Sequence, residues 1–226
     1  MHWGRSIILC AAAITLAAGC STPTSTSPST RTSTPTVGGA PASTSGSGAA
    51  GKPAAAQSRR PARLDALALQ SRWWTRAAST PRRSNPVVDP DGTFCSENQP
   101  SDIWFLAGNF GGRSDRTCSV PAGLPVVFPL VNRAAPEESC VSFMAGAEGK
   151  AVLDGKPLTT ELHTATPIMF KGVEGNPITG EAGPVITQGC GLWVQTDPLP
   201  PGPHTLTITA SSGDFSLDVR YRLQVG

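Results

Sequence analysis

The chain has little charge and few aromatic residues. Asp, Glu, Lys and Arg make up 15% of its 226 residues, and Phe, Trp and Tyr make up 6%. A net charge of +2 argues neither for nor against a nucleic-acid partner, but no stacking motif accompanies the basic residues, which disfavours nucleic-acid binding. The apolar run at residues 6–18 has 13 residues, fewer than the roughly 20 that a membrane-spanning helix needs.

Catalytic signatures are also missing. The sequence contains no Gly-x-Ser-x-Gly elbow, no His-Glu-x-x-His helix and no P-loop. It has no Cys-x-x-Cys pair and no Cys close to a His, which disfavours a metal site. We therefore predict no catalytic residue, no metal and no cofactor. A hydrolase remains the alternative, and its candidate groups are His204 and the carboxylates Asp89, Asp91, Asp102 and Asp115.

The first 19 residues have the layout of an export signal. Arg5 provides a positive start, residues 6–18 are apolar, and Leu16-Ala17-Ala18-Gly19-Cys20 resembles a bacterial lipobox. The resemblance implies cleavage before Cys20 and lipid attachment to it, including an acyl chain such as palmitate. An ordinary cleaved signal that leaves Cys20 unmodified is the alternative. Two or more acyl chains would hold the protein stably on the extracytoplasmic face of the cell membrane.

Residues 20–58 are almost wholly Ser, Thr, Pro, Gly and Ala, a composition that predicts a disordered tether. Nine basic residues and one acidic residue lie between positions 31 and 83, a net charge of +8, whereas 8 basic and 15 acidic residues follow, a net charge of −7. The basic part either complements the acidic part, is simply solvated, or contacts anionic headgroups or wall polymer.

A folded domain is expected over residues 59–226. A helical stripe of Ala66, Leu69, Trp73 and Ala77 between Pro61 and Pro81 predicts one helix. We expect Trp73 and Trp74 to pack this helix against a sheet. The Asp89-x-Asp91-Gly92 segment could suggest a calcium loop, but a Pro-Asp-Gly turn explains it better.

The clearest strand signal is at the carboxyl end. Alternating apolar residues at 204–210 and 215–225, joined by a Ser-Ser-Gly-Asp turn, predict a β-hairpin. Further strands are expected at 103–107, 116–120, 124–131, 141–144, 163–170 and 191–195, with a hairpin around Asp154-Gly155. The two prolines within 124–131 indicate an edge or bulged strand. The fold class is therefore all-β: an immunoglobulin-like (Ig-like) or jelly-roll-like antiparallel β-sandwich preceded by one N-terminal helix, with Phe105, Val127, Trp193 and the Phe215 series in its core.

Four cysteines remain after the anchor, at positions 95, 118, 140 and 190. An even number in an exported domain predicts two disulfides with three possible pairings. We favour Cys95–Cys118 with Cys140–Cys190, because the first pair would attach a loop to a nearby hairpin.

Several short blocks stand in a characteristic order: Trp73-Trp74, Asn85-Pro86, Gln99, Trp-Phe-Leu-Ala-Gly at 104–108, Gly111-Gly112, Cys118-x-Val120-Pro-x-Gly123, Phe-Pro-Leu-Val-Asn at 128–132, Leu-Asp-Gly at 153–155 and Pro-Pro-Gly-Pro-His-Thr at 200–205. Together they resemble a family of secreted bacterial β-rich proteins and lipoproteins of unassigned function. The resemblance covers residues 71–225 and implies a domain boundary but no chemistry.

These features predict a lipid-anchored binding or interaction module at the cell envelope. Its partner would be a wall polymer or an envelope protein, contacted through loops between strands. The candidate binding residues are Asn85, Asp89, Asn109 and Asn132, polar residues beside turns shaped by glycine or proline. An envelope hydrolase and a structural envelope protein are the alternatives.

Overall fold

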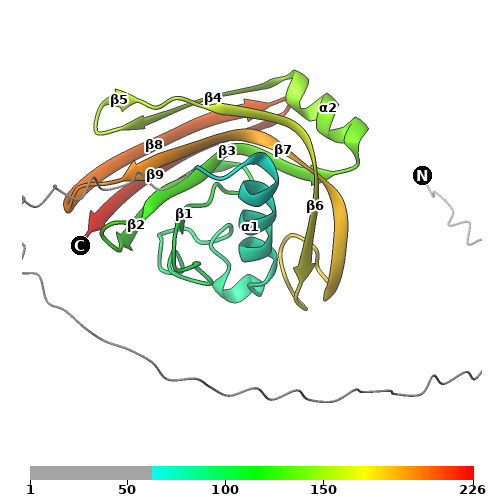
Figure 1. Ribbon diagram of the computed structural model, residues 1–226, viewed down its shortest axis with the longest axis horizontal. Coiled ribbons are helices and arrows are strands. Elements are labelled where there is room, and N and C mark those ends of the chain that lie inside the picture. Colours follow the sequence, from blue (N-terminus) through cyan, green and yellow to red (C-terminus); the bar gives the residue numbers. More distant parts are fainter. Residues whose placement is uncertain (1–62) are drawn as a thin grey trace, which may run out of the picture. The chain divides into compact units, whose positions relative to one another are not determined.

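The computed structural model describes residues 63–226 and shows two β-sheets packed face to face, with a helix against the outer side of one of them (Figure 1). One sheet has the strand order β1-β3-β7-β6, and the other has the order β2-β9-β8-β4-β5. The predicted all-β sandwich with a helix at its start is therefore confirmed.

The helices are α1 (Ala66–Ala78) and α2 (Glu137–Ala145), with a short 3-10 turn η1 (Arg82–Ser84). The four-stranded sheet contains β1 (Trp104–Phe105), β3 (Pro125–Ala135), β6 (Glu161–Gly172) and β7 (Gly183–Pro198). The five-stranded sheet contains β2 (Gly112–Val120), β4 (Ala147–Leu153), β5 (Lys156–Pro157), β8 (Gly202–Ser212) and β9 (Phe215–Val225).

The hairpin predicted at the carboxyl end is β8–β9. It is antiparallel from Gly202↔Val225 to Ser212↔Phe215, which leaves Gly213-Asp214 as a two-residue loop. Gly213 has a φ of +57°, a conformation that glycine adopts without the usual steric cost. The Leu217–Val225 positions of the apolar series are buried and alternate with polar residues, as the period of two requires. The Asp154-Gly155 turn joins β4 to β5, also as predicted.

The four-stranded sheet is buried on both faces, which divides the apolar side chains into two cores. On β3, Phe128 faces the five-stranded sheet and belongs to a core that includes Leu206, Val219 and Tyr221. Val127, its neighbour, faces α1. The second core contains Leu69, Trp73, Phe105, Val127 and Trp193. The single predicted core is therefore wrong: Phe105, Val127 and Trp193 lie on the helix side, and the Phe215 series lies between the sheets.

Helix α1 is held on the sheet by its two tryptophans, as predicted. Trp73 meets Trp193 edge to face with ring centroids 5.8 Å apart, and Trp74 stacks on Phe170 at 5.8 Å. At the start of the helix Asp65 caps the N–H of Ala68 with a 2.8 Å hydrogen bond. Such aromatic contacts contribute about 0.5–1.5 kcal/mol each beyond burial, so the helix is an integral layer of the domain.

Both predicted disulfides are present. Cys95–Cys118 attaches the loop before β1 to β2, with the Cα atoms 6.0 Å apart. Cys140–Cys190 joins α2 to β7, with the Cα atoms 5.8 Å apart. Each therefore links a segment outside the sheets to a strand.

The structure departs from the sequence predictions in three places. Residues 141–144 belong to helix α2 rather than to a strand. Strand β3 is bulged at both prolines, as expected, but lies between β1 and β7 rather than at an edge. The pairs β1–β3 and β2–β9 run parallel, unlike the antiparallel pairing that we expected throughout.

The predicted signal peptide (1–19), Cys20 and the tether (20–58) lie outside the described residues. Neither helix within residues 63–226 is long and apolar enough to cross a membrane.

Candidate functional site

Two of the four predicted binding residues hold loops in place. Asn85 is fully buried, and its Nδ2 donates to the carbonyls of Ala77 at 2.7 Å and Thr80 at 2.8 Å, closing the end of α1. Its Oδ1 accepts the N–H of Val87 at 3.0 Å. These bonds occupy the Asn85 amide within the fold.

Asp89 shapes the turn that was compared with a calcium loop. Its carboxylate accepts the backbone N–H groups of Asp91 at 3.2 Å, Gly92 at 3.0 Å and Phe94 at 2.8 Å. Only 2% of Asp89 is exposed, so it stabilises the turn from inside. Within residues 63–226, no group of three or more His, Cys, Asp or Glu side chains is placed to hold a metal ion.

The other two predicted residues, Asn109 and Asn132, meet at one pocket. Asn109 lies in the turn before β2, and Asn132 lies on β3, 23 positions later in the sequence. The pocket has a volume of about 90 Å³. Its lining comes from α1, the loop after η1, the turn before β2, β3, the loop after β6 and β9: Trp73, Trp74, Val87, Gly108, Asn109, Phe110, Leu130, Val131, Asn132, Ile178, Phe215 and Leu217.

The wall of this pocket is mostly apolar and carries no charged side chain. Asn109 is a fixed part of it, because its Nδ2 donates to Ser114 Oγ at 2.8 Å and its Oδ1 accepts the N–H of Gly111 at 2.9 Å. By contrast, Asn132 Nδ2 and Trp74 Nε1 are buried N–H donors without a hydrogen-bond acceptor. A buried donor without an acceptor costs about 1–3 kcal/mol, and native proteins rarely retain one without a reason.

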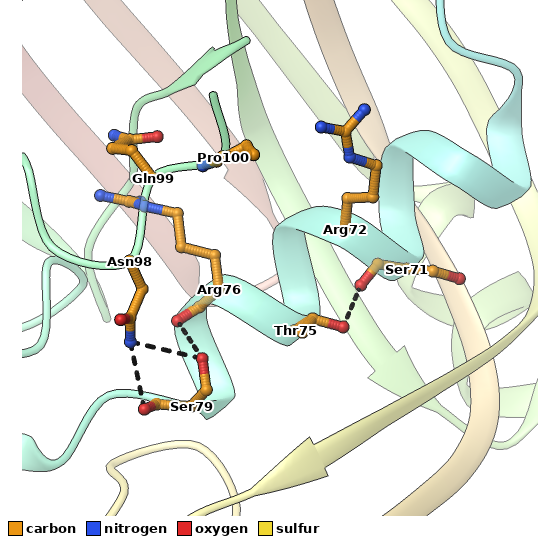
Figure 2. Close-up of a pocket in the computed structure, with 8 residues that line it drawn as sticks. All are labelled: Ser71, Arg72, Thr75, Arg76, Ser79, Asn98, Gln99 and Pro100. Carbon is orange, nitrogen blue, oxygen red and sulfur yellow. Dashed lines mark hydrogen bonds between the residues drawn. The ribbon is translucent and has the colours of Figure 1, made fainter. Parts of the chain in front are cut away.

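A second, open groove of about 480 Å³ runs along α1 beside Asn98–Pro100 (Figure 2). Its polar groups are largely bonded to each other or to the chain: Asn98 Nδ2 donates to Thr80 Oγ1 at 2.9 Å and to the Ser79 carbonyl at 3.2 Å, and Arg72 pairs with Asp102. This groove therefore has few polar groups left to bind a ligand.

Arg76 extends from α1 toward Asn98 and Gln99, away from Arg72 (Figure 2). Although Arg76 is charged, only 3% of it is exposed. Its Nε donates to the Glu97 carbonyl at 3.0 Å and its Nη2 to the Cys95 carbonyl at 2.9 Å. Burial lowers the pKa of Arg76 to about 10, so it is still charged at neutral pH and fixes this loop.

The carboxylates considered for a hydrolase already have partners within the fold. Asp91 accepts from the hydroxyl and the N–H of Thr93, Asp102 pairs with Arg72, and Asp115 pairs with Arg113 at 3.1 Å. None of them, nor Asp89, lines the pocket at Asn109 and Asn132.

His204 lies against a carboxylate, as the histidine of a catalytic triad does. Its Nδ1 lies 2.6 Å from Asp154 Oδ2, and its Nε2 lies 2.8 Å from the Pro200 carbonyl. The hydrogen bond to Asp154 raises the pKa of His204, helped by the Pro200 carbonyl, and the same bond lowers the pKa of Asp154. Because both ring nitrogens are occupied, the imidazole has no nitrogen available to take a proton from a nucleophile.

Sequence reasoning missed most of the pocket wall. Trp74 packs the helix on the sheet, as expected, and it also lines the pocket. Phe110 lies in the turn before β2 and Ile178 in the loop after β6, and neither was predicted as a site residue. A bulky apolar residue such as Phe110 in a turn, 57% exposed in the structure, was the available signal.

A scan against protein-family models finds no match, and a search of curated proteins finds none. Among solved structures, a cysteine protease inhibitor from Entamoeba histolytica, EhICP2, is similar to this chain with 15% identity, a TM-score of 0.27, and coverage of 57% of this chain and 100% of the inhibitor. PbICP-C, solved in complex with falcipain-2, gives 14% identity, a TM-score of 0.26, and coverage of 54% and 98%. Similarity at this level carries no inference about function.

Proposed function

We propose that this protein is a lipid-anchored binding module on the outer side of the cell membrane. Its pocket at Asn109 and Asn132 would contact a cell-wall polymer or an envelope protein. The pocket supports this proposal because its mostly apolar lining includes two side-chain amides, those of Asn109 and Asn132. Apolar pockets with a few converging polar groups are the usual form of a binding site.

The anchor is part of the same proposal. Residues 1–19 act as the signal, Cys20 carries the lipid, and residues 20–58 form a tether, in line with the resemblance to secreted bacterial lipoproteins. Replacing Cys20 with Ala should move the full-length protein from the membrane fraction to the soluble fraction. Continued membrane association of that variant would contradict the anchor.

Binding without covalent chemistry can be tested with purified cell-wall fragments. We expect the full-length protein to be retained on the fragments and to release no soluble sugar or amine. Phe110→Ala, which shortens an exposed lining residue, should lower retention about tenfold, since it removes most of an aromatic contact surface. Met169→Ala is the matched control, because Met169 is 64% exposed on β6 and does not line the pocket.

Two results would contradict the binding proposal. Equal retention of the wild-type and Phe110→Ala proteins would show that the pocket is not the contact. Released products that disappear in Asp154→Asn or in Asp102→Asn would instead establish the hydrolase, the alternative function.

A further inference from the structure

The pocket at Asn109 and Asn132 has a wall with little polar surface. Nine of its twelve lining residues are Trp, Phe, Val, Leu or Ile, and none is charged. A charged group that entered it would lose its water without compensation. The group that enters is therefore neutral and largely apolar.

The two asparagines differ in what they leave for a ligand. The Asn109 amide is engaged in its own turn, with Ser114 Oγ and the N–H of Gly111. Asn132 is half-buried, and its Nδ2 is sealed inside the wall, beyond the reach of a ligand. Its Oδ1 is neither sealed in this way nor hydrogen-bonded within residues 63–226. Asn132 Oδ1 is therefore an acceptor that the wall offers, and the matching ligand supplies a donor.

The size of the pocket limits this group to a few heavy atoms. Its volume of about 90 Å³ corresponds to the share of about three water molecules in the liquid. Sites that enclose a whole small molecule are larger, at roughly 300–1,000 Å³. The pocket therefore receives one small substituent, and the rest of the ligand lies outside it.

Phe110 offers a surface to that outer part of the ligand. It lines the pocket, and yet 57% of it is exposed. The turn that carries it is fixed at Asn109, as described above. An exposed aromatic ring packs well against a flat apolar surface, such as the C–H face of a sugar ring. Phe110 therefore favours a ring-shaped ligand at the mouth of the pocket.

We propose that the pocket receives the N-acetyl group of an amino sugar in a neutral polysaccharide. The methyl group lies against the apolar wall, the amide N–H donates to Asn132 Oδ1, and the sugar ring packs on Phe110. The inference rests on the proposed binding function and names its ligand class. In a planar trans amide the N–H lies on the same side as the acetyl methyl group, and the carbonyl points the other way. One acetamido group therefore supplies both the apolar contact and the donor, and its carbonyl faces solvent.

The test uses the full-length chain labelled with ¹⁵N and a matched pair of neutral sugars, chitotriose and cellotriose. Chitotriose carries an acetamido group where cellotriose carries a hydroxyl group, and the two are otherwise alike. The readouts are the side-chain amide signal of Asn132 and the backbone N–H signal of Phe110. We expect chitotriose to bind at least about tenfold more tightly than cellotriose, because the acetamido group adds one buried methyl group and one hydrogen bond.

Two variants complete the design. Asn132→Leu keeps the approximate volume and removes the acceptor, and should weaken chitotriose binding about tenfold. Phe110→Ala removes the surface under the sugar ring and should weaken it by a similar factor. If Asn132→Leu does not fold, Phe110→Ala serves in its place, since Phe110 is largely exposed. Met169→Ala, outside the pocket lining, should bind chitotriose as the unmodified chain does.

Equal binding of chitotriose and cellotriose, or unchanged chitotriose binding by Phe110→Ala, would overturn the inference while leaving a binding function in place. The peptide formyl-Ala-Leu-Ala-amide is the polypeptide probe, and tighter binding of this peptide than of chitotriose would assign the pocket to a protein partner and also overturn it. Absence of any shift with every probe would overturn the inference too, and retention on wall fragments then decides the proposed function separately.

Discussion

Arg116 on β2 and Tyr221 on β9 share a buried hydrogen bond, in which Arg116 Nη1 donates to Tyr221 Oη at 2.8 Å. The tyrosine hydroxyl donates in turn to the carbonyl of Ala107 at 2.7 Å. The guanidinium, 1% exposed, also donates to the carbonyls of Ala107, Gly108 and Val87. Carbonyl dipoles thus hold a buried charge, and the pair ties the segments that flank the pocket to the five-stranded sheet.

Removing this hydroxyl should destabilise the domain. Tyr221→Phe deprives Arg116 Nη1 of one acceptor and the Ala107 carbonyl of one donor, both buried. We expect the free energy of unfolding, measured by urea denaturation, to fall by about 1–2 kcal/mol. Arg222→Lys, on the exposed face of the same strand, is the control and should change it by less than about 0.5 kcal/mol. An unchanged Tyr221→Phe would mean that the network contributes nothing to stability.

Gly92 should tolerate no side chain, for two separable reasons. Its φ is +95°, and a Cβ at this position would lie 2.2 Å from the Thr117 carbonyl oxygen on β2. Gly155 also has a positive φ, +79°, but a Cβ there would have no other atom within 4 Å. Gly155→Ala should therefore cost about 1–2 kcal/mol through backbone strain alone. Gly92→Ala should cost about 1–3 kcal/mol more, because the overlap is with backbone.

Thermal unfolding of the two glycine variants distinguishes these contributions. Equal losses for Gly92→Ala and Gly155→Ala would show that the turn at Asp89–Gly92 does not pack tightly on β2.

The two disulfides should differ in their effect on stability. Cys140–Cys190 spans 50 positions and Cys95–Cys118 spans 23. Loop-closure entropy gives each about 2–4 kcal/mol and makes the longer loop worth roughly 0.7 kcal/mol more. Double Cys→Ala variants, compared by denaturant unfolding, should show the larger loss for Cys140–Cys190. A larger loss for the shorter loop would show that local packing outweighs chain entropy here.

Local patterns in the sequence were sufficient for the faces of the strands but not for their partners. Alternation in 204–225 predicts the β8–β9 hairpin because the two strands are adjacent and joined by a tight turn. Nothing in 112–120 shows that β2 runs parallel to β9, since that pair is formed by residues more than 100 positions apart. The continuous apolar run at Val126–Val131 did signal a strand buried on both faces, and reading it that way would have predicted the second core.

Helix α2 shows a different limit. Among its residues only Cys140 is buried, so the segment has no apolar stripe to reveal it. The disulfide and its position beside β7 hold it in place instead. Local sequence did not show the pocket either. Asn109 and Asn132 were predicted individually from turn chemistry, but their meeting at one pocket depends on the arrangement of the whole sheet.

His204 and Asp154 should make stability depend on pH in a defined window. The hydrogen bond to Asp154 raises the pKa of His204 above its ordinary value of about 6.5. Its contribution is therefore complete below about pH 6.5 and is lost as pH rises through the folded-state pKa. The lowered pKa of Asp154, caused first by His204 and then by the N–H of Thr205, gives a contribution that is present above about pH 3.9. It is lost as pH falls through the lowered value, so the pair stabilises the fold most between about pH 4 and 6.5.

An NMR titration of the His204 imidazole in the full-length chain measures this directly. The pKa should lie above about 6.5 and return toward it in Asp154→Asn, whereas Asp214→Asn, in the β8–β9 turn, should leave it unchanged. A His204 pKa that is the same with and without the Asp154 carboxylate would show that the contact does not form in solution. In that case Nδ1 would be free to accept a proton, and only the Pro200 carbonyl would occupy the ring.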